Sequence, residues 1–228
     1  RTKWNFALQR ACELSKELNK PLLVLEALRI DYPWACDRFH RFVIEGMRDN
    51  QRSFAQEEIT YYPYVEPHQG ASKGLLAALC ADACALISDE FPCFFIPKMQ
   101  KVFAQKNPVY FEVVDSNGIL PLREPERTFT TAASFRRHLQ KNITPHLAQF
   151  PKPSALHLAI KKAPIKPNII SQWPLASIEL LNGSQNLSAF AINHTISPTR
   201  LSGGEQAAQK RLTSFFSDRI QRYHSDRN

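Results

Sequence analysis

The residues best suited to chemistry stand together in one short segment, in which two acidic side chains are followed by three aromatic ones. Asp89 and Glu90 come first, and the aromatic residues are Phe91, Phe94 and Phe95. Aromatic rings stack on planar ligands, and carboxylates accept hydrogen bonds from ring N–H groups. This pattern could hold a planar pigment. In a second interpretation, which we favour, the rings pack the segment against the following linker or another domain.

The rest of the sequence contains no residue pattern typical of acid–base catalysis or of a metal site. No Ser/His/Asp set, no Cys/His pair and no cluster with metal-ligand spacing is present. The adjacent acids Glu57 and Glu58 are expected in a turn and are interpreted as solvated. The histidines are scattered, and we expect them on the surface or at helix ends. They are His40, His68, His138, His146, His157, His194 and His224. We therefore assign no catalytic residue and no metal ligand.

The string Leu201–Gln206 is similar to the signature loop of ABC-type ATPases. That loop works only together with a G-x-x-x-x-G-K-[ST] string that cradles phosphates. The sequence contains no such string, and the nearest candidate, Gly70–Gly74, has the wrong spacing. We interpret Leu201–Gln206 as a helix start, with Ser202 as the N-cap and Glu205 at the capping-box spacing.

Cysteine usage and composition narrow the class of protein. The five cysteines are odd in number and form no C-x-x-C pair, so we interpret them as small buried side chains in a reducing compartment. They are Cys12, Cys36, Cys80, Cys84 and Cys93. The chain is 43% hydrophobic but lacks an apolar run of about 18 residues, which predicts a core and no membrane span. No export signal follows Arg1, so we expect a cytoplasmic protein.

The formal net charge is +8, and the positive charge is unevenly spread. Between Arg127 and Ile178 the sequence contains no Asp or Glu. A long basic tract without acids indicates a polyanionic partner, most simply nucleic acid. A solvated linker with incidental charge is the alternative. The basic residues of the tract are Arg127, Arg136, Arg137, Lys141, Lys152, Lys161, Lys162 and Lys166.

Helical and strand patterns alternate four times before residue 116. Helices are expected over residues 4–19, 35–53, 74–80 and 97–105, and strands over 21–27, 59–65, 84–89 and 109–115. This alternation predicts an α/β fold with a doubly wound, mostly parallel sheet of the Rossmann or flavodoxin kind. Because a helix comes first, one more strand is expected before Arg1. No G-x-G-x-x-G follows any strand, so ordinary dinucleotide binding lacks its fingerprint.

The last third of the chain is expected to leave the sheet domain. Residues 123–200 are rich in proline and should form a basic linker that runs extended along the surface, apart from a helix over 131–149 broken at Pro145. A helix then starts near Ser202. Its apolar residues share one face and require a partner; they are Ala208, Leu212, Phe215, Phe216, Ile220 and Tyr223. We expect this helix to open a second domain that continues past Asn228.

Several spaced residues together resemble the DNA photolyase and cryptochrome family, in its class II-like form. The terminal helix is similar to the entry of the family's flavin-binding helical domain. The likeness there is carried by Gly203, Gly204, Ala207, Ala208, Leu212, Phe215, Tyr223, Arg227 and Asn228. The earlier segments that resemble the family are Trp4–Leu8, Pro21–Leu25, Val113–Leu122 and the start of the connection at Phe129–Lys141.

The resemblance implies an antenna-type α/β domain over residues 1–122, an interdomain linker over 123–200 and the start of an FAD-binding helical domain over 201–228. It implies a deoxyribodipyrimidine photolyase, a carbon–carbon lyase in which a reduced, light-excited flavin donates an electron to a cyclobutane pyrimidine dimer in DNA. The lack of acid–base residues agrees with that chemistry. This chain by itself is expected to be inactive.

The resemblance also implies particular ligands and partners. Tyr223 takes the position of a tyrosine that contacts FAD, although it could instead simply pack on the apolar face. An antenna chromophore, deazaflavin or folate, is expected to accompany the flavin. Damaged DNA is the expected partner of a monomer that is not attached to a membrane. A cryptochrome-like blue-light receptor without repair and an unrelated nucleotide-binding α/β domain remain as alternatives.

Overall fold

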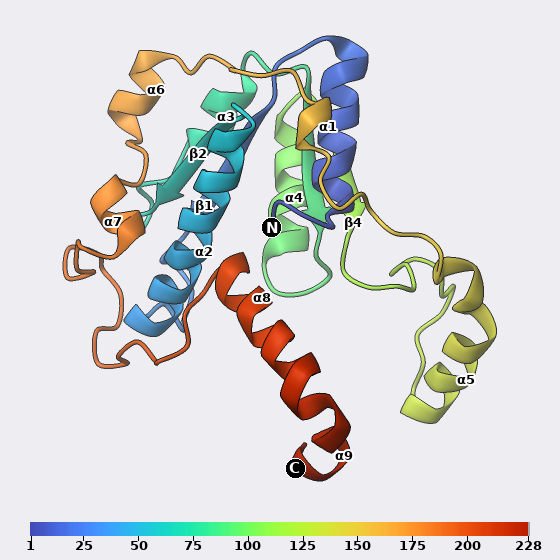
Figure 1. Ribbon diagram of the computed structural model, residues 1–228. Helices are drawn as coiled ribbons and strands as arrows, with labels where there is room; N and C mark the ends of the chain where they lie inside the picture. Colours follow the sequence, from blue (N-terminus) through green and yellow to red (C-terminus); the bar gives the residue numbers. More distant parts are fainter. Residues whose placement is uncertain (228) are drawn as a thin grey trace. The chain divides into compact units, whose positions relative to one another are not determined.

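The computed structural model describes residues 1–227, and helices and strands alternate through its first half (Figure 1). The alternating elements are α1 (Phe6–Leu18), β1 (Leu23–Leu28), α2 (Asp37–Gln56), β2 (Thr60–Val65), α3 (Leu75–Cys80), β3 (Ala85–Glu90), α4 (Ile96–Lys106) and β4 (Tyr110–Asp115). The later helices are α5 (Ala132–Asn142), α6 (Pro167–Gln172), α7 (Ile178–Asn182), α8 (Glu205–Ser214) and α9 (Tyr223–Asp226). The expected alternation is present, which confirms the α/β class.

The strands form two parallel pairs. In the first pair, β1 and β2 set Leu23 opposite Thr60, and in the second, β3 and β4 set Ala85 opposite Tyr110. Parallel neighbours need a crossover connection, which α2 supplies for the first pair and α4 for the second. The strand expected before Arg1 is not tested by these residues and stays a prediction.

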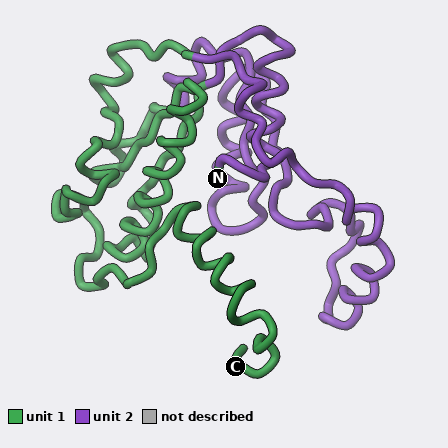
Figure 2. The backbone as a smooth tube through the Cα atoms, viewed as in Figure 1, with its two compact units in different colours: residues 1, 23–75, 162–228 green, residues 2–22, 76–161 purple. Residues whose placement is uncertain are grey.

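The chain divides into two compact units, each of which combines distant parts of the sequence (Figure 2). Unit 1 contains residues 23–75 and those from Lys162 onward, together with Arg1. Unit 2 contains residues 2–22 and 76–161. Each unit therefore holds one parallel strand pair and a piece of the proline-rich segment.

The core of unit 1 joins α2 and β2 to residues beyond 175. Its buried members are Ile44, Met47, Val65, Leu180, Leu181, Leu187 and Phe190. Full burial of a side chain of this size contributes about 1.5–3 kcal/mol relative to exposure. Members from beyond residue 175 therefore supply a substantial share of the stability of the unit.

The proline-rich segment does not run extended along the surface, so this expectation is wrong. Trp173 is 6% exposed, and its indole N–H donates to the Ala71 carbonyl at 2.9 Å. In unit 2, the Ile160 amide donates to the Ser15 hydroxyl at 3.0 Å. Among its buried residues, Ile169 lies on α6 and Leu180 and Leu181 lie on α7. These helices have six and five residues, which is too short for a clear periodic pattern. The helix before Pro145 is present as α5.

The buried face of α2 also differs from the expected one. The apolar spacing of the sequence predicts an inward face made of Phe39, Phe42, Val43, Gly46 and Met47. Met47 is buried as expected, but Phe39, Phe42 and Val43 are 50%, 49% and 36% exposed. The other buried side chains of α2 are His40, Ile44, Asp49 and Phe54. The helix carries apolar residues on more than one stripe, and periodicity alone does not decide which stripe meets the core.

Unit 2 is organised around α1, which packs against β3 and β4. Asn5 caps the helix by accepting a hydrogen bond from the Leu8 amide at 3.1 Å. The Ser116 hydroxyl, directly after β4, accepts a hydrogen bond from the Ala7 amide at 3.2 Å. Arg10 forms an ion pair with Glu112 of β4 at 3.0 Å. These contacts fix the start of α1 beside the carboxyl end of β4.

The cysteines only partly meet expectation. Cys12, Cys36 and Cys80 are buried, whereas Cys84 and Cys93 are exposed, and all five thiols are free. Among the described residues, no helix has both the length and the apolar character needed to cross a lipid bilayer.

His40 is a buried exception among the histidines, which were expected near the surface. Its side chain is fully buried and stacks on Tyr32 with ring centroids 6.1 Å apart. Neither ring nitrogen has a hydrogen-bond partner among the described residues. Burial lowers the pKa of His40, and the nearby Cys36 carbonyl and Asp37 carboxylate oppose this shift only in part. The folded protein therefore favours the neutral imidazole.

The substitution His40→Leu is expected to stabilise the protein by about 1 kcal/mol at pH 7, because it removes two buried nitrogens without partners. The gain should grow as the pH falls below about 6.5, since the unfolded chain then binds a proton that the folded state excludes. Urea titrations at pH 7 and pH 5 would measure both effects. The exposed control His224→Leu should change little, and a loss of stability in His40→Leu at pH 5 would contradict this explanation.

Candidate functional site

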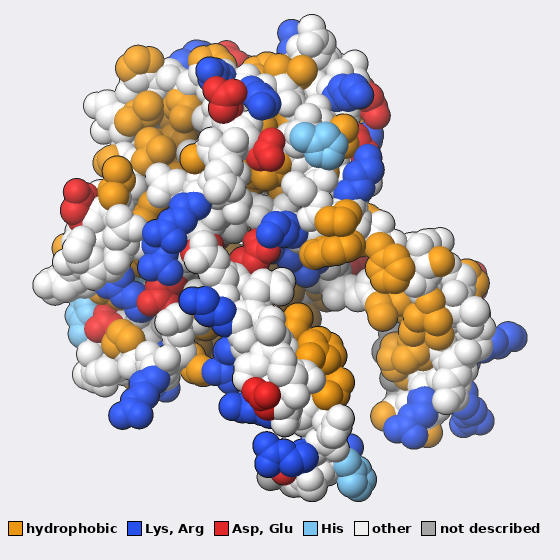
Figure 3. Space-filling model, viewed as in Figure 1, with side chains coloured by type: hydrophobic (Ala, Val, Ile, Leu, Met, Phe, Trp, Pro, Cys, Tyr) orange, Lys and Arg blue, Asp and Glu red, His pale blue; other side chains and the backbone are white. Residues whose placement is uncertain are grey.

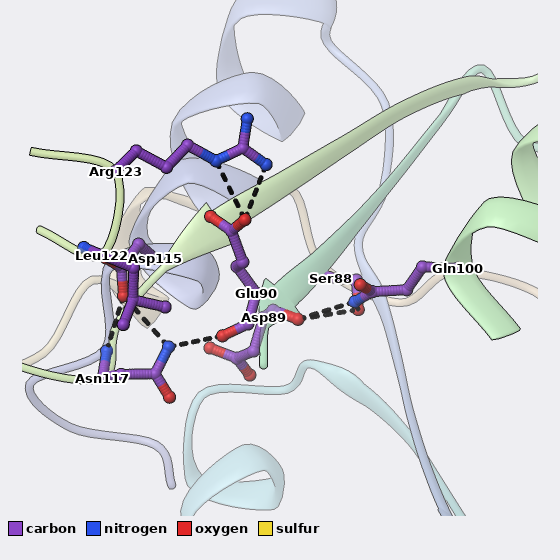
Figure 4. Close-up of polar contacts among 8 residues, drawn as sticks. All are labelled: Ser88, Asp89, Glu90, Gln100, Asp115, Asn117, Leu122 and Arg123. Atoms are coloured by element: carbon purple, nitrogen blue, oxygen red, sulfur yellow. Dashed lines mark hydrogen bonds and ion pairs between the residues drawn. The ribbon is translucent and has the colours of Figure 1, made fainter. Parts of the chain in front are cut away.

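The carboxyl ends of β3 and β4 place the expected pigment-binding segment at one edge of unit 2. The two strands are parallel, and Glu90 lies opposite Asp115 in their register. The segment after β3 and the segment after β4 therefore emerge side by side (Figure 4). In open parallel sheets this edge is where ligands usually bind.

Asp115 is occupied in holding the segment that follows β4. One carboxylate oxygen accepts hydrogen bonds from the backbone and side-chain amides of Asn117, both at 3.0 Å. The other accepts from the Leu122 amide at 2.6 Å. Burial alone would raise the pKa of Asp115, but these hydrogen bonds and the positive charge of Arg123 outweigh it, so the pKa lies below its usual value. Asp115 is thus an ionised residue that stabilises the segment following β4.

Glu90 is engaged in the same way. Arg123 donates to one oxygen of Glu90 from Nε at 2.9 Å and from Nη2 at 2.6 Å. The side-chain amide of Asn117 also donates to the Glu90 carbonyl, so Asn117 bridges the ends of both strands (Figure 4). Of the two acids expected to face a pigment, Glu90 is therefore already paired.

Asp89 has a different environment. It accepts hydrogen bonds from Ser88 and Gln100 through its backbone carbonyl, and the residue is exposed. Its carboxylate is the acid of the segment that is available for a further donor.

The three aromatic rings of the segment are exposed. Phe91, Phe94 and Phe95 are 41%, 73% and 43% exposed, and the first two rings stack at 6.3 Å with an angle of 6° between their planes. Phe94 has a φ of 60°, a backbone conformation that costs a residue other than glycine free energy. The rings present apolar surface rather than filling the interior, and their role as a pigment site or as a docking surface stays a prediction.

Tyr223 lies on the helical segment that ends the described chain. Phe215 contacts the rings of Phe216 and Tyr223 edge to face, with centroids 5.7 and 5.9 Å away. Leu212, Phe216 and Tyr223 are 47%, 56% and 55% exposed. The sequence predicted an apolar face that the rest of this chain does not enclose, and the described residues confirm it. The flavin contact of Tyr223 is not tested, and Asn228 of the matching motif lies outside the described residues.

This helix does not begin as expected. It starts at Glu205 with Gly204 as the N-cap residue, and no capping bond comes from a neighbouring side chain in the sequence. The prediction of Ser202 as N-cap is wrong, because Gly204 takes that position and Asp49 of α2 accepts the hydrogen bond of the Gln206 amide.

Some cations of the basic tract form ion pairs in the structure, and others do not. Lys152 pairs with Glu13 at 3.3 Å and Lys162 pairs with Glu58 at 2.8 Å, so these charges are compensated. The exposed cations of α5 have no acidic partner among residues 1–227; they are Arg136, Arg137 and Lys141. In Figure 3, Lys and Arg side chains gather at the free end of the α5 segment beside hydrophobic ones. Within this tract, the cations without an acidic partner among residues 1–227 thus include three on α5.

Sequence reasoning overlooked Arg123 and the bridging role of Asn117. The Asp-Ser-Asn-Gly string after β4 is typical of a turn in which the aspartate accepts from the backbone two residues on, which Asp115 and Asn117 do. The partnership of Arg123 with Glu90 joins residues 33 apart, and no local spacing rule predicts it.

The substitution Asp115→Asn should lower the free energy of unfolding by about 1–2 kcal/mol at pH 7, because a neutral amide oxygen accepts hydrogen bonds more weakly than a carboxylate. Since the folded pKa is depressed, this contribution is present above the unfolded value of about 3.9 and is lost as the pH falls through the folded value. The difference from the parent should therefore shrink in acid.

Urea titrations at several pH values would measure this dependence. The matched control is Asp89→Asn, which changes an exposed carboxylate at the same edge and should shift stability by less than about 0.5 kcal/mol. Equal losses in the two variants would contradict the assigned role of Asp115.

Comparison with known proteins supports the resemblance drawn from the sequence. No protein-family model matches the chain. The chain is 28% identical over 150 residues to a deoxyribodipyrimidine photo-lyase of Methanothermobacter thermautotrophicus. The aligned region covers 64% of this chain but 33% of that relative, so the chain spans about a third of the protein that it matches.

The alignment agrees with the structure. The chain alternates helices and parallel strands and then ends in a helical segment, as the resemblance implied. The alignment and the α/β architecture together support the resemblance of this chain to the N-terminal α/β domain of the DNA photolyase family.

Proposed function

We propose that the chain is the N-terminal part of a light-dependent enzyme that repairs cyclobutane pyrimidine dimers in DNA. The observation that carries the proposal is the similarity to a deoxyribodipyrimidine photo-lyase. The absence of an acid–base or metal constellation in the sequence supports it, since a reduced flavin that donates an electron needs no such groups from this chain. The parent protein would be a cytoplasmic monomer with FAD and lyase activity.

Tyr223 is the residue of this chain that we propose as a contact to FAD. Its ring is 55% exposed and belongs to an aromatic face with Phe215 and Phe216. Such a face suits one side of a planar ring system. One tyrosine cannot hold a dinucleotide, so most of the contacts would come from helices that follow in the parent protein.

The β3–β4 edge is our proposed contact for an antenna chromophore, deazaflavin or folate. The exposed rings Phe91, Phe94 and Phe95 offer stacking surface, and the Asp89 carboxylate offers an acceptor. Glu90 is excluded from this role, because its carboxylate is paired with Arg123.

Flavin retention tests the proposal. The isolated chain should not retain stoichiometric FAD after purification, whereas a form that continues past Asn228 should. In that longer form, Tyr223→Ala should weaken FAD binding by about tenfold, equal to about 1.4 kcal/mol, and the exposed control Phe150→Ala should not. Stoichiometric FAD on the isolated chain would show that further helices are unnecessary.

Repair itself separates the two light-dependent alternatives. Thymine-dimer substrate incubated with the longer form should be restored under blue or near-ultraviolet light and stay unchanged in the dark. Flavin binding without repair would instead indicate a cryptochrome-like receptor.

The cations of α5 are our proposed contact with the phosphates of DNA. Each phosphate contact that is lost should reduce the slope of log affinity against log salt by about 0.9. The triple variant R136Q/R137Q/K141Q should therefore bind duplex DNA with a clearly shallower slope than the parent chain. The control K98Q/K101Q/K106Q removes the same charge from α4, and equal slopes in the two variants would contradict a specific role for α5.

A further inference from the structure

The start of α8 docks against one stripe of α2 within unit 1. The stripe consists of residues at spacings of three and four, which lie on one side of a helix. Its members are Phe42, Glu45, Gly46 and Asp49. Gly203, which precedes α8, is buried at this contact.

Two carboxylates of the stripe accept hydrogen bonds from backbone amides at the start of α8, one from Gly203 before the helix and one from Gln206 in its first turn. Glu45 Oε2 accepts from the Gly203 amide at 2.6 Å, and Asp49 Oδ2 accepts from the Gln206 amide at 3.0 Å. Asp49 is 4% exposed. The first amides of a helix lack partners within the helix, and negative charge is favourable at this end. Asp49 therefore caps the first turn in place of Ser202, and Glu45 holds the residue that precedes the N-cap.

Both glycines of the pair are required by the close approach of the two helices. A Cβ on Gly203 would lie 1.9 Å from the Phe42 carbonyl oxygen, and a Cβ on Gly204 would lie 2.4 Å from Asp49 Oδ2. Gly204 also has a φ of 93°, which strains other residues. The Gly-Gly pair thus serves backbone packing against α2.

The same contact excludes the nucleotide-binding interpretation of Leu201–Gln206. A phosphate bound at a helix start needs free backbone amides and no competing negative charge. Here the amides of Gly203 and Gln206 already donate to Glu45 and Asp49. A phosphate would have to displace two carboxylates.

The rest of the terminal segment has little support from unit 1. No side chain of α8 is buried, and no residue from Phe215 to Asp226 is buried either. The direction of the segment therefore depends on its first residues. Two hydrogen bonds three residues apart restrain a helix start against pivoting more than one bond would.

We propose that Glu45 and Asp49 are positioning residues that fix the start and the direction of the terminal helix relative to α2. They thereby hold its aromatic face, including Tyr223, at a defined place on unit 1. The consequence for FAD rests on the proposed function, but the positioning itself requires neither flavin, light nor DNA.

Spin-label distances and amide exchange on the 228-residue chain test this role. One label would be attached through Arg52→Cys on α2 and one through Gln209→Cys on α8, with Cys84→Ser and Cys93→Ser to remove the exposed thiols. The parent should give a narrow distance distribution. Glu45→Ala combined with Asp49→Ala should broaden it and speed exchange of the Gly203 and Gln206 amides at least tenfold. Amides of the β1–β2 ladder should remain protected as in the parent.

Three further variants separate positioning from general stability. Asp49→Asn keeps an acceptor oxygen and should restore part of the protection that Asp49→Ala loses. Gly203→Ala disturbs the same contact from the α8 side, because the added Cβ would clash with the Phe42 carbonyl, and it should also broaden the distance distribution. Glu57→Ala, at the end of α2, is the matched control and should change neither readout. An unchanged distribution in the double variant, or equal loss of protection in the β1–β2 ladder, would overturn the proposal.

Discussion

The docking of α8 on α2 is the interaction on which the rest of this account depends. Glu45 and Asp49 bind the first amides of the terminal helix, and Gly203 and Gly204 let the two backbones approach. Beyond this contact the helix presents an exposed aromatic face. An exposed apolar face of this kind is typical of a surface that meets a partner. Under the proposed function, this face would meet the flavin-binding helical domain that the resemblance to photolyases implies.

The parallel strand pairs explain why polar residues gather where they do. At the carboxyl edge of β3 and β4, Asp115, Asn117, Glu90 and Arg123 tie the two outgoing segments together. These polar groups are already paired with one another, so Asp89 and the exposed phenylalanines are the residues of this edge that could contact a ligand. For ligand binding, the pairing of each acid matters more than the number of acids in the segment.

The local parts of this fold were predictable from the sequence. Asn19 ends α1 in the left-handed conformation, and the apolar run after Pro21 forms a parallel strand, because caps and strands depend on neighbouring residues. Long-range partnerships were not predictable. Nothing in the local sequence reveals that Asp49, 157 residues before Gln206, accepts the hydrogen bond of the Gln206 amide. Likewise, nothing near Leu180 reveals that it joins the core with Ile44. The same limit applies to the candidate site, where the availability of Asp89 follows from the pairing of Glu90 with Arg123.

Our central proposal is that residues following the terminal helix in a longer parent protein cover its aromatic face. Amide hydrogen exchange over residues 205–226, compared between this chain and a form that continues past Asn228, tests that claim most directly. We expect rapid exchange after the first turn in the shorter chain and slowing by at least a hundredfold in the longer one. Equally rapid exchange in both forms would contradict the account.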